Sequence, residues 1–488
     1  MRRHEAESNP EFAFLSETQR EPHSKTSRKM IPSRAASGRC AQIDSLRGNK
    51  MAIRATVRLF VLGFAGLMAF QAALGAQGSN VNGATLQYVV MLSRHGVRSP
   101  LQTPAELERF SAAPWPKWPV APGILTPHGY GLMKLFGAWD RARFSGQGLF
   151  AASGCADASH VTILADTDER TRDTGKALAD GMLPGCTVPV HSQHLGMNDP
   201  LFRSLEAGIG RANMGLSVAA IDGRIGGNAG NLTEAYRPQL TALDRVLAGC
   251  GHVRSGNPAR VSIFGIPASL GPGNGDRPAA LRGPLPTAAT LTANLMLEYA
   301  EGMSDANIGW GCMDGATLRS LMQIDGAAWE YGTRTPVIAR AKASNLLYHI
   351  EKSMEQSVAG KPVAGALGAP GDRLLILVGH DTNIATVAGA LNINWIVDGR
   401  VDDTPPGGAL LFEVWRPRDG GKPFVRLEYT AQTIDQMRSG QTLTAANPPV
   451  EAPIFVPACS RDDLSCGFDG FQAAVRQAID PAYVRPQR

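Results

Sequence analysis

The sequence lacks several features that mark specialised classes of protein. It has only 7 cysteines among 488 residues and no CxxC pair, so nothing in it indicates a zinc or dithiol redox site. No internal repeat appears, and beyond residue 76 no apolar run is long enough for a transmembrane span. A chain of this length with 43% hydrophobic residues can bury a sizeable core, so we expect a globular protein of two or three domains.

Basic charge is in excess only at the start of the chain. The formal net charge is +5, but residues 1–76 hold twelve Lys and Arg against six Asp and Glu, which leaves about −1 for the remainder. A basic leader does not indicate a polyanion-binding surface. The charge pattern therefore predicts no nucleic-acid partner, and it does not bear on the oligomeric state.

The N-terminal segment has the pattern of an export signal. Two arginines, an apolar stretch and small residues follow Met51 in order: Arg54 and Arg58, residues 59–73, then Gly75 with Ala76. We predict a signal peptide over 51–76, with an uncleaved anchor as the alternative. Residues 1–50 show no periodicity and are interpreted as a non-native or disordered extension. Cleavage would leave a periplasmic or secreted enzyme or binding protein without stable membrane association.

The cysteines agree with export. Cys40 falls in the leader, and six remain: Cys155, Cys186, Cys250, Cys312, Cys459 and Cys466. An even number in an exported protein favours disulfides, although buried free thiols are the alternative and number alone does not give the pairing.

Three short apolar runs, each followed by polar residues, predict buried parallel strands. The runs cover 86–92, 161–165 and 374–378, and they precede Arg94, residues 166–170 and residues 379–382. Open α/β sheets bind ligands at the shared carboxyl edge of such strands. Helix-like segments follow at 169–180 and 382–391, and their amino ends favour a phosphate dianion. The predicted fold class is α/β, a doubly wound and mostly parallel sheet flanked by helices.

The middle of the chain differs in composition. Gly- and Pro-rich stretches such as 265–286 interrupt segments with helical periodicity, among them 287–301 and 316–329. We predict a mostly helical cap domain over 198–344, inserted into an α/β domain made of 77–197 and 345–488.

A histidine between two arginines follows the first predicted strand. The segment 94–100 reads RHGVRSP. Two guanidinium groups offer forked donors to phosphate oxygens, and their charge disfavours the protonated imidazole of His95, which keeps it nucleophilic. We expect Gly96 to let the backbone approach a ligand closely. A solvated surface histidine is the alternative.

Three motifs together resemble one family. RHGVRSP at 94–100, ADTDERT at 165–171 and GHDTN at 379–383 are similar to the signatures of the histidine acid phosphatases, the second branch of the histidine phosphatase superfamily. The likeness runs from about residue 84 to the C-terminus and is nearest to the bacterial periplasmic subgroup of phytases and glucose-1-phosphatases. It is weakest over 198–300.

The resemblance implies a role for each site residue. His95 attacks phosphorus to give a phosphohistidine, and Asp381 protonates the leaving group and then activates water. The phosphate oxygens are bound by four further residues, namely Arg94, Arg98, Arg170 and His380. The arginines replace a cation, so neither a metal nor another cofactor is expected. Because Asp381 must be protonated to act, an acidic pH optimum is predicted. Arg170 as an exposed residue and Asp381 as a simple helix cap are the alternatives.

The resemblance also implies disulfides and leaves the substrate open. It pairs Cys155 with Cys186 and Cys459 with Cys466, which leaves Cys250 for Cys312. Leu101 and Gln102 stand where phytase-like relatives tend to carry Thr and Lys, so strong phytate binding is in doubt unless Arg203 or Arg211 substitutes.

Three functions follow from these observations. The first is an acid phosphomonoesterase with phytate as a candidate small-molecule substrate, and the second is a narrow sugar-phosphate phosphatase. The third is a non-catalytic phosphate-binding protein, which the retained His95 and Asp381 disfavour.

Overall fold

The computed structural model describes residues 83–253 and 256–486. The predicted signal peptide and the extension before it lie outside these residues. Among the described helices, none combines the length and the apolar character needed to cross a bilayer.

A mixed sheet of eight strands forms the centre of the described chain. Its order is β11-β10-β9-β1-β6-β2-β3, with β12 paired to β10. The strands are β1 (Ala84–Arg94), β2 (Val161–Ala165), β3 (Val190–His191), β6 (Leu374–Gly379), β9 (Ala409–Pro417), β10 (Phe424–Ala431), β11 (Val450–Ile454) and β12 (Cys466–Gly467). The three predicted strands are parallel neighbours in the order β1-β6-β2, while β9 to β12 extend the sheet in antiparallel fashion. The α/β class and the parallel arrangement of the predicted strands are confirmed.

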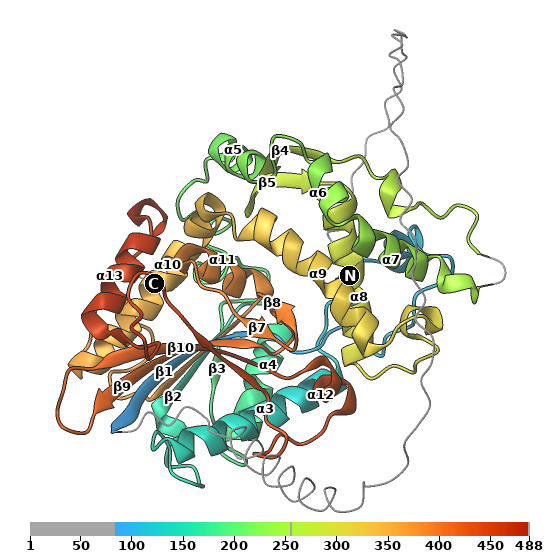
Figure 1. Ribbon diagram of the computed structural model, residues 1–488. Coiled ribbons are helices and arrows are strands. Elements are labelled where there is room, and N and C mark those ends of the chain that lie inside the picture. Colours follow the sequence, from blue (N-terminus) through green and yellow to red (C-terminus); the bar gives the residue numbers. More distant parts are fainter. Residues whose placement is uncertain (1–82, 254–255, 487–488) are drawn as a thin grey trace, which may run out of the picture. The chain divides into compact units, whose positions relative to one another are not determined.

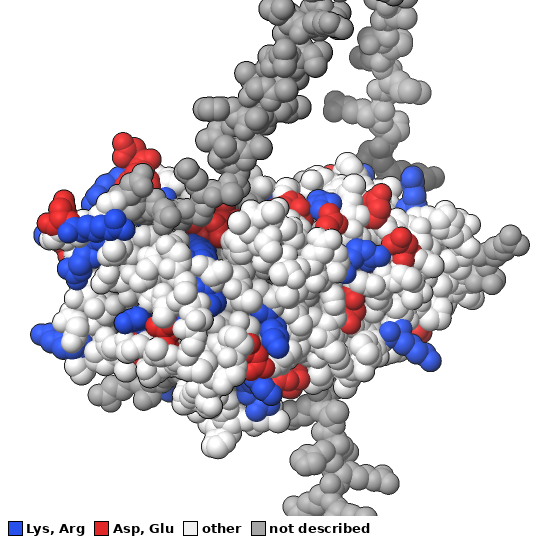
Figure 2. Space-filling view, turned by 90° about the horizontal axis from the view of Figure 1, so that it is seen from below, with Lys and Arg blue, Asp and Glu red and all other residues white. Residues whose placement is uncertain are grey.

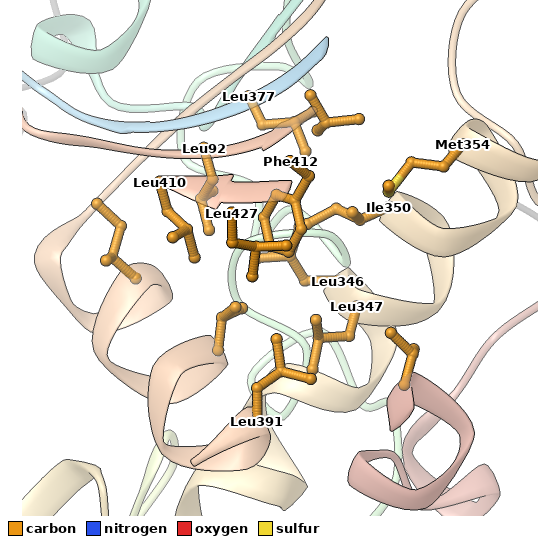
Figure 3. Packing of buried hydrophobic residues seen from close by; sticks show 14 of the residues in the cluster. Leu92, Leu346, Leu347, Ile350, Met354, Leu377, Leu391, Leu410, Phe412 and Leu427 are labelled. Carbon is orange, nitrogen blue, oxygen red and sulfur yellow. The ribbon is translucent and has the colours of Figure 1, made fainter. Parts of the chain in front are cut away.

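Helices cover both faces of the sheet, which explains why β1 is apolar without alternation. One face packs on α10 (Pro336–Ala359), α11 (Asp381–Leu391) and α13 (Phe468–Ala478), and the other on α3 (Pro127–Gly146) and α4 (Glu169–Met182) (Figure 1). Val90 and Leu92 enter the first core, whereas Val89 and Met91 enter the second. Figure 3 shows the first core, where Leu92 and Phe412 of the sheet face Leu346 and Ile350 of α10.

The segment between β3 and α10 is helical, with one hairpin. Its helices are α5 (Met214–Arg224), α6 (Gly230–Ala235), α7 (Arg237–Leu247), α8 (Pro284–Ala300) and α9 (Gly315–Ala328). Strands β4 (Ser269–Asn274) and β5 (Arg277–Arg282) form an antiparallel hairpin inside the Gly- and Pro-rich stretch for which no strand was predicted. The hairpin lies mostly at the surface, so its composition reflects a turn and exposed strands more than a buried pattern.

A third hydrophobic core joins this helical segment to parts of the chain outside it. Helices α7, α8 and α9 supply many of its members, such as Leu243, Leu295 and Leu321. Val97 follows β1 directly, and Ile434 begins α12 (Ile434–Ser439). The helical segment therefore packs on the loop that follows the RHG motif.

A group of buried charges lies on the antiparallel side of the sheet. Arg143 of α3 contacts Glu413 of β9 at 2.6 Å, Glu428 of β10 at 2.7 Å and Glu451 of β11 at 3.7 Å. Asp140, one helical turn earlier, is fully buried. Burial, opposed by Arg143, raises the pKa of Asp140 to about 8, and burial likewise raises the pKa of Glu428 to about 7. These five residues are called the Arg143 cluster below.

Disulfides join the two cysteine pairs that the family resemblance implied and the third pair that remained. Cys155 is bonded to Cys186, Cys250 to Cys312, and Cys459 to Cys466. On the face of the molecule that Figure 2 shows, basic and acidic side chains are interspersed, as a near-neutral mature chain predicts.

Candidate active site

The three motifs meet at the carboxyl edge of three adjacent strands. In the register of the parallel ladders, Arg94 of β1 lies opposite Gly379 of β6, and Val378 of β6 lies opposite Ala165 of β2. The backbone N–H of His95 donates to the Gly379 carbonyl at 3.0 Å, and that of Asp166 donates to the Val378 carbonyl at 3.0 Å. Hydrogen bonds of the sheet therefore fix the relative positions of the segments that carry the predicted site.

His95 is buried and held in one tautomer. Only 2% of its surface is exposed, and its Nδ1 lies 2.8 Å from the carbonyl oxygen of Gly96. A carbonyl oxygen can only accept, so Nδ1 carries the proton and Nε2 keeps a free lone pair. Burial, followed by the charges of Arg170, Arg98 and Arg94, lowers the pKa of His95 well below its usual value. The ring is therefore neutral and can act as a nucleophile at acidic pH.

Three guanidinium groups surround this ring. Arg94 donates to the Thr404 carbonyl at 2.5 Å, Arg98 to the Ser99 carbonyl at 2.8 Å, and Arg170 to Asp168 at 2.6 Å. Each of the three keeps a buried Nε without a partner among the described residues. Burial and the nearby Arg170 and Arg94 lower the pKa of Arg98 to about 9. So many buried donors of one sign form a site that an anion would stabilise.

Asp381 begins α11 at the same edge. Its Oδ2 lies 3.0 Å from Arg94, and its Oδ1 accepts from the Thr382 N–H at 2.8 Å. Burial opposes ionisation of this carboxyl, but Arg94, His380 and Arg98 outweigh burial and lower its pKa. The N-cap of α11 is His380, and Asp381 is the first residue of the helix, where it accepts from the next N–H and contacts Arg94.

His380 is oriented by two aspartates of the second motif. Its Nε2 lies 2.7 Å from Asp166 and 3.4 Å from Asp168, and its ring centroid is 5.6 Å from that of His95. Arg203 donates to Asp166 at 2.8 Å and to Asp168 at 2.6 Å. Burial alone would raise the pKa of Asp166, but the hydrogen bond and charge of His380, together with Arg203, lower it to about 2. The network fixes the His380 ring with the fully buried Asp166 behind it.

The same network bears on a possible metal. Asp166, Asp168 and His380 offer three ligand atoms within 4.8 Å of one another. The guanidinium groups of Arg203 and Arg170 already contact the carboxylate oxygens that a cation would use. The set is therefore a poorer fit to a metal than to the guanidinium groups that it binds.

The residues expected to set specificity lie beside the site. Gln102 accepts a hydrogen bond from Asn294 of α8 at 3.1 Å, and Leu101 is 41% exposed. A Cβ on Gly123 would lie 2.9 Å from Leu101 and 3.6 Å from Arg170, so the side chains of Leu101 and Arg170 both lie close to Gly123. Arg203 is engaged by aspartates, and Arg211 lines a surface hollow with Met214 and Asn274.

Gly96, which we expect to let the backbone approach a ligand, also packs closely against helix α3. A Cβ at this position would lie 2.8 Å from Met133 and 3.2 Å from the Gly129 carbonyl of α3, so close packing on that helix requires glycine. The Gly96 N–H also donates to Thr174 of α4 at 2.9 Å. Thr174 was not singled out from the sequence, because it lies beyond the motif at 165–171 and its contact with Gly96 depends on the packing of α4.

Comparisons with known proteins agree with this geometry. The family model of the histidine phosphatase superfamily (branch 2) matches residues 85–209 and 318–430. Phytase AppA of Escherichia coli is 33% identical over 81% of this chain and 93% of its own length, and a glucose-1-phosphatase of Salmonella typhimurium is 26% identical over 86% and 98%.

Solved structures give the same result. The phytase of Hafnia alvei in complex with tartrate has a TM-score of 0.75 at 31% identity, covering 83% of this chain and all of that one. The Citrobacter braakii phytase has a TM-score of 0.73 at 31% identity, covering 82% of this chain and 99% of that one. With three family motifs at one sheet edge and relatives of this coverage, the chain belongs to branch 2 of the histidine phosphatase superfamily and is a histidine acid phosphatase that hydrolyses phosphate monoesters.

Proposed function

We propose that the enzyme works in two steps through a phosphohistidine on His95, with Asp381 as the proton donor. The observation that supports this most is the state of His95, a buried neutral ring whose Nε2 lone pair is free amid three guanidinium groups. In the first step the Nε2–P bond forms and the ester P–O bond breaks. The leaving oxygen takes a proton from Asp381.

Arg94, Arg98, Arg170 and His380 bind the transferring phosphoryl group. Burial and neighbouring arginines lower the pKa values of Arg98 and Arg170, and a bound phosphate relieves this repulsion. In the second step water attacks phosphorus, Asp381 takes a proton from that water, and the N–P bond breaks. Inorganic phosphate leaves and His95 is neutral again.

The proton of the first step enters with the substrate. In the free site Arg94, His380 and Arg98 keep the pKa of Asp381 low, against burial. A bound phosphate cancels part of that positive charge, so the pKa of Asp381 rises in the complex. A monoanionic substrate also brings its own proton. Protonation of Asp381 in the complex and the monoanionic form of the substrate are both favoured at low pH, which supports the acidic optimum.

The similar proteins, a phytase and a glucose-1-phosphatase, suggest two substrate classes, phytate and a sugar phosphate. Gln102 and Asn294 pair with each other as neutral groups, and Leu101 beside them is apolar. Arg203 is bound by two aspartates, so it does not supply the extra cation that a polyphosphate would need. These contacts favour an ester with one phosphate and an uncharged leaving group, with phytate as the second candidate. Activity outside the cytoplasm, in the periplasm or the medium, is part of the proposal.

Trapping the intermediate tests the mechanism. Rapid quenching with a phosphate-labelled ester is expected to leave label on the wild-type chain that is stable to base and labile to acid. His95→Ala is expected to show neither the label nor turnover, with an unchanged circular dichroism spectrum. Labelling of this variant, or turnover by it, would reject His95 as the nucleophile.

A substrate panel tests the specificity. Phytate, glucose 1-phosphate and an aryl phosphate are compared by kcat/KM at acidic pH. We expect the two single-phosphate esters to exceed phytate. A preference for phytate would show that cations elsewhere in the chain reach the substrate.

A further inference from the structure

Helix α4 reaches the backbone of the first motif through the hydroxyl of Thr174. This residue is fully buried, and its Oγ1 accepts a hydrogen bond from the N–H of Gly96 at 2.9 Å. Gly96 directly follows His95, and its carbonyl oxygen lies 2.8 Å from Nδ1 of the His95 ring. The hydroxyl of Thr174 is therefore joined to the ring through a single residue, Gly96.

Hydrogen bonds hold the peptide group between His95 and Gly96 at both of its polar atoms. The carbonyl of His95 accepts from the N–H of Gly407 at 3.0 Å. The N–H of the same peptide group, which belongs to Gly96, donates to Thr174. The preceding peptide group is held as well, because the N–H of His95 donates to the carbonyl of Gly379. Of these three partners only Thr174 uses its side chain, so a substitution can remove its bond and leave the other two.

The direction of the Gly96 carbonyl depends on such support. Glycine has no Cβ, so its backbone dihedral angles are less restricted than those of other residues. The next carbonyl, that of Val97, accepts from the N–H of Thr126 at 3.0 Å. The peptide group that carries the Gly96 carbonyl thus lies between one anchored by Thr174 and one anchored by Thr126. Loss of either anchor would let that carbonyl turn away from the His95 ring.

The same helix supplies a phosphate ligand of the proposed mechanism. Arg170 lies four residues before Thr174, a spacing that places both on one face of α4. Thr171 between them is also fully buried, and its hydroxyl lies 2.7 Å and 2.6 Å from the carbonyls of Asp166 and Asp168. Helix α4 therefore holds the backbone of the first motif as well as that of the second.

We propose that Thr174 is a positioning residue for the nucleophile: its hydroxyl orients the backbone at Gly96 so that the Gly96 carbonyl keeps the proton of His95 on Nδ1 and leaves Nε2 free to attack phosphorus. This inference rests on the proposed function, because it takes His95 as the nucleophile. It assigns the orientation of the ring to a helix outside the first motif.

The consequence is a specific defect when the hydroxyl is removed. The N–H of Gly96 would then be buried without an acceptor, which costs free energy unless the peptide group turns. Once it turns, the Gly96 carbonyl no longer accepts from Nδ1, and a ring that carries its proton on Nε2 has no lone pair there to attack phosphorus. The arginines that bind phosphate keep their own contacts. The defect should therefore appear in the rate of phosphoryl transfer and not in phosphate binding.

Thr174→Val tests this directly, because valine has the shape of threonine and no hydroxyl. The substrate is an aryl phosphate, whose phenolate leaves without prior protonation, so that the rate depends little on Asp381. In single-turnover experiments, phosphoenzyme formation is expected to be about ten- to a hundredfold slower than in the wild type. The inhibition constant of inorganic phosphate is expected to stay within about twofold of the wild-type value.

A second pair of variants separates the hydroxyl from the methyl group of Thr174. Thr174→Ser and Thr174→Ala both lose the methyl group and differ from each other in the hydroxyl. The serine variant is expected to react nearly as fast as the wild type, and the alanine variant as slowly as Thr174→Val. The matched control is Thr292→Val in α8, since Thr292 is fully buried and its hydroxyl has no partner among the described residues. This control is expected to match the wild type.

The tautomer of His95 gives a readout that a loss of stability alone would not move. Its ring signals in a ¹⁵N NMR spectrum are assigned by their absence from His95→Ala. The wild type is expected to carry the proton on Nδ1, as the contact with the Gly96 carbonyl requires. In Thr174→Val the proton is expected to move in part to Nε2, and in Thr174→Ser it is expected to stay on Nδ1.

Equal rates of phosphoenzyme formation in Thr174→Val and the wild type would overturn the inference. So would a loss of phosphate binding as large as the loss of rate, because Thr174 would then act through Arg170 and not through His95. If Thr174→Val does not fold, the comparison of the serine and alanine variants decides alone. None of these results affects the phosphohistidine mechanism, which fails only if His95→Ala still turns over or is labelled.

Discussion

Two groups of buried charges lie along the same sheet, and they differ in the sign of their excess. Around His95, three arginines face two aspartates, Asp381 beside Arg94 and Asp168 beside Arg170. In the Arg143 cluster, one arginine faces four carboxyl groups. The first group lies where parallel strands end, and the second lies among helix α3 and the antiparallel strands.

The difference shows how each excess is relieved. An excess of guanidinium groups cannot lose protons near neutral pH, so it is relieved by binding an anion. An excess of carboxyl groups is relieved by binding protons, which needs no ligand. We therefore expect the first group to bind phosphate and the second to make the stability of the fold depend on pH. The following variants test this contrast.

Removing the proton donor should have the largest effect. Asp381→Asn is expected to lower kcat for a sugar phosphate by about 10²–10⁴-fold, and for an aryl phosphate much less, because a phenolate leaves without prior protonation. The KM should fall, since Arg94 loses its counter-charge. Steady-state kinetics on both esters measure this, with the exposed Asp469→Asn as control. Equal losses on both esters would contradict the role as acid.

Removing one of the repelling arginines should separate activity from stability. Arg98→Gln is expected to lower kcat/KM by about 10²–10³-fold. Without phosphate its melting temperature should rise, because a buried repulsion is removed. Inorganic phosphate should then raise the melting temperature of the variant less than that of the wild type.

The control for this pair of measurements is Arg416→Gln, on an exposed position of β9. It should match the wild type in both respects. Two results together would contradict the proposal that the arginines repel one another until an anion binds. They are a lower melting temperature of Arg98→Gln without phosphate, and a rise with phosphate equal to that of the wild type.

The Arg143 cluster should make the wild type less stable as pH rises. In the folded state the pKa values of Asp140 and Glu428 are about 8 and about 7, which is higher than in an unfolded chain. At pH values between the unfolded and the folded pKa, the folded state therefore binds more protons than the unfolded state. The contribution of these two groups to stability is greatest below about pH 4, falls up to about pH 8 and is then constant.

Asp140→Asn removes part of this dependence. We compare the free energy of unfolding of the variant with that of the wild type. The difference should favour the variant by a few kcal/mol more at about pH 8 than at about pH 4. Urea midpoints across this range measure it, and Asp469→Asn should parallel the wild type. A wild-type stability that increased with pH over the same interval would show that other groups dominate.

The smallest effect is expected from a chelator. Turnover should be unchanged after dialysis against EDTA, because guanidinium groups occupy the carboxylates that could bind a cation. A loss of activity restored by one divalent metal would assign Asp166, Asp168 and His380 to that metal instead.

The strand-end residues could be predicted because each is adjacent in sequence to the apolar run that positions it. Arg94 ends β1 and His95 follows it, and His380 and Asp381 follow β6, so locating the strands also located the residues of the site. The parallel register then brought them together. The orientation of His95 was beyond prediction, since it depends on the direction of the Gly96 carbonyl.

Residues whose partners are distant in sequence could not be found in this way. Arg143 meets glutamates some 270 to 310 positions away on three strands. Arg203 was named as a candidate cation for the substrate, but its aspartate partners showed it to be a support for His380.

The shared hydrophobic core has a consequence for recombining this chain with its relatives. Leu243 and Leu295 lie inside the helical segment, and Val97 and Ile434 lie outside it, yet all belong to one packed cluster. Crossover points near 198 and 344 would combine the two sides of this cluster from different parents. A chimera made there inherits a mismatched interface at Val97, the residue before Arg98, so grafting substrate preference by exchanging the helices requires co-transfer of the loop that follows the first motif.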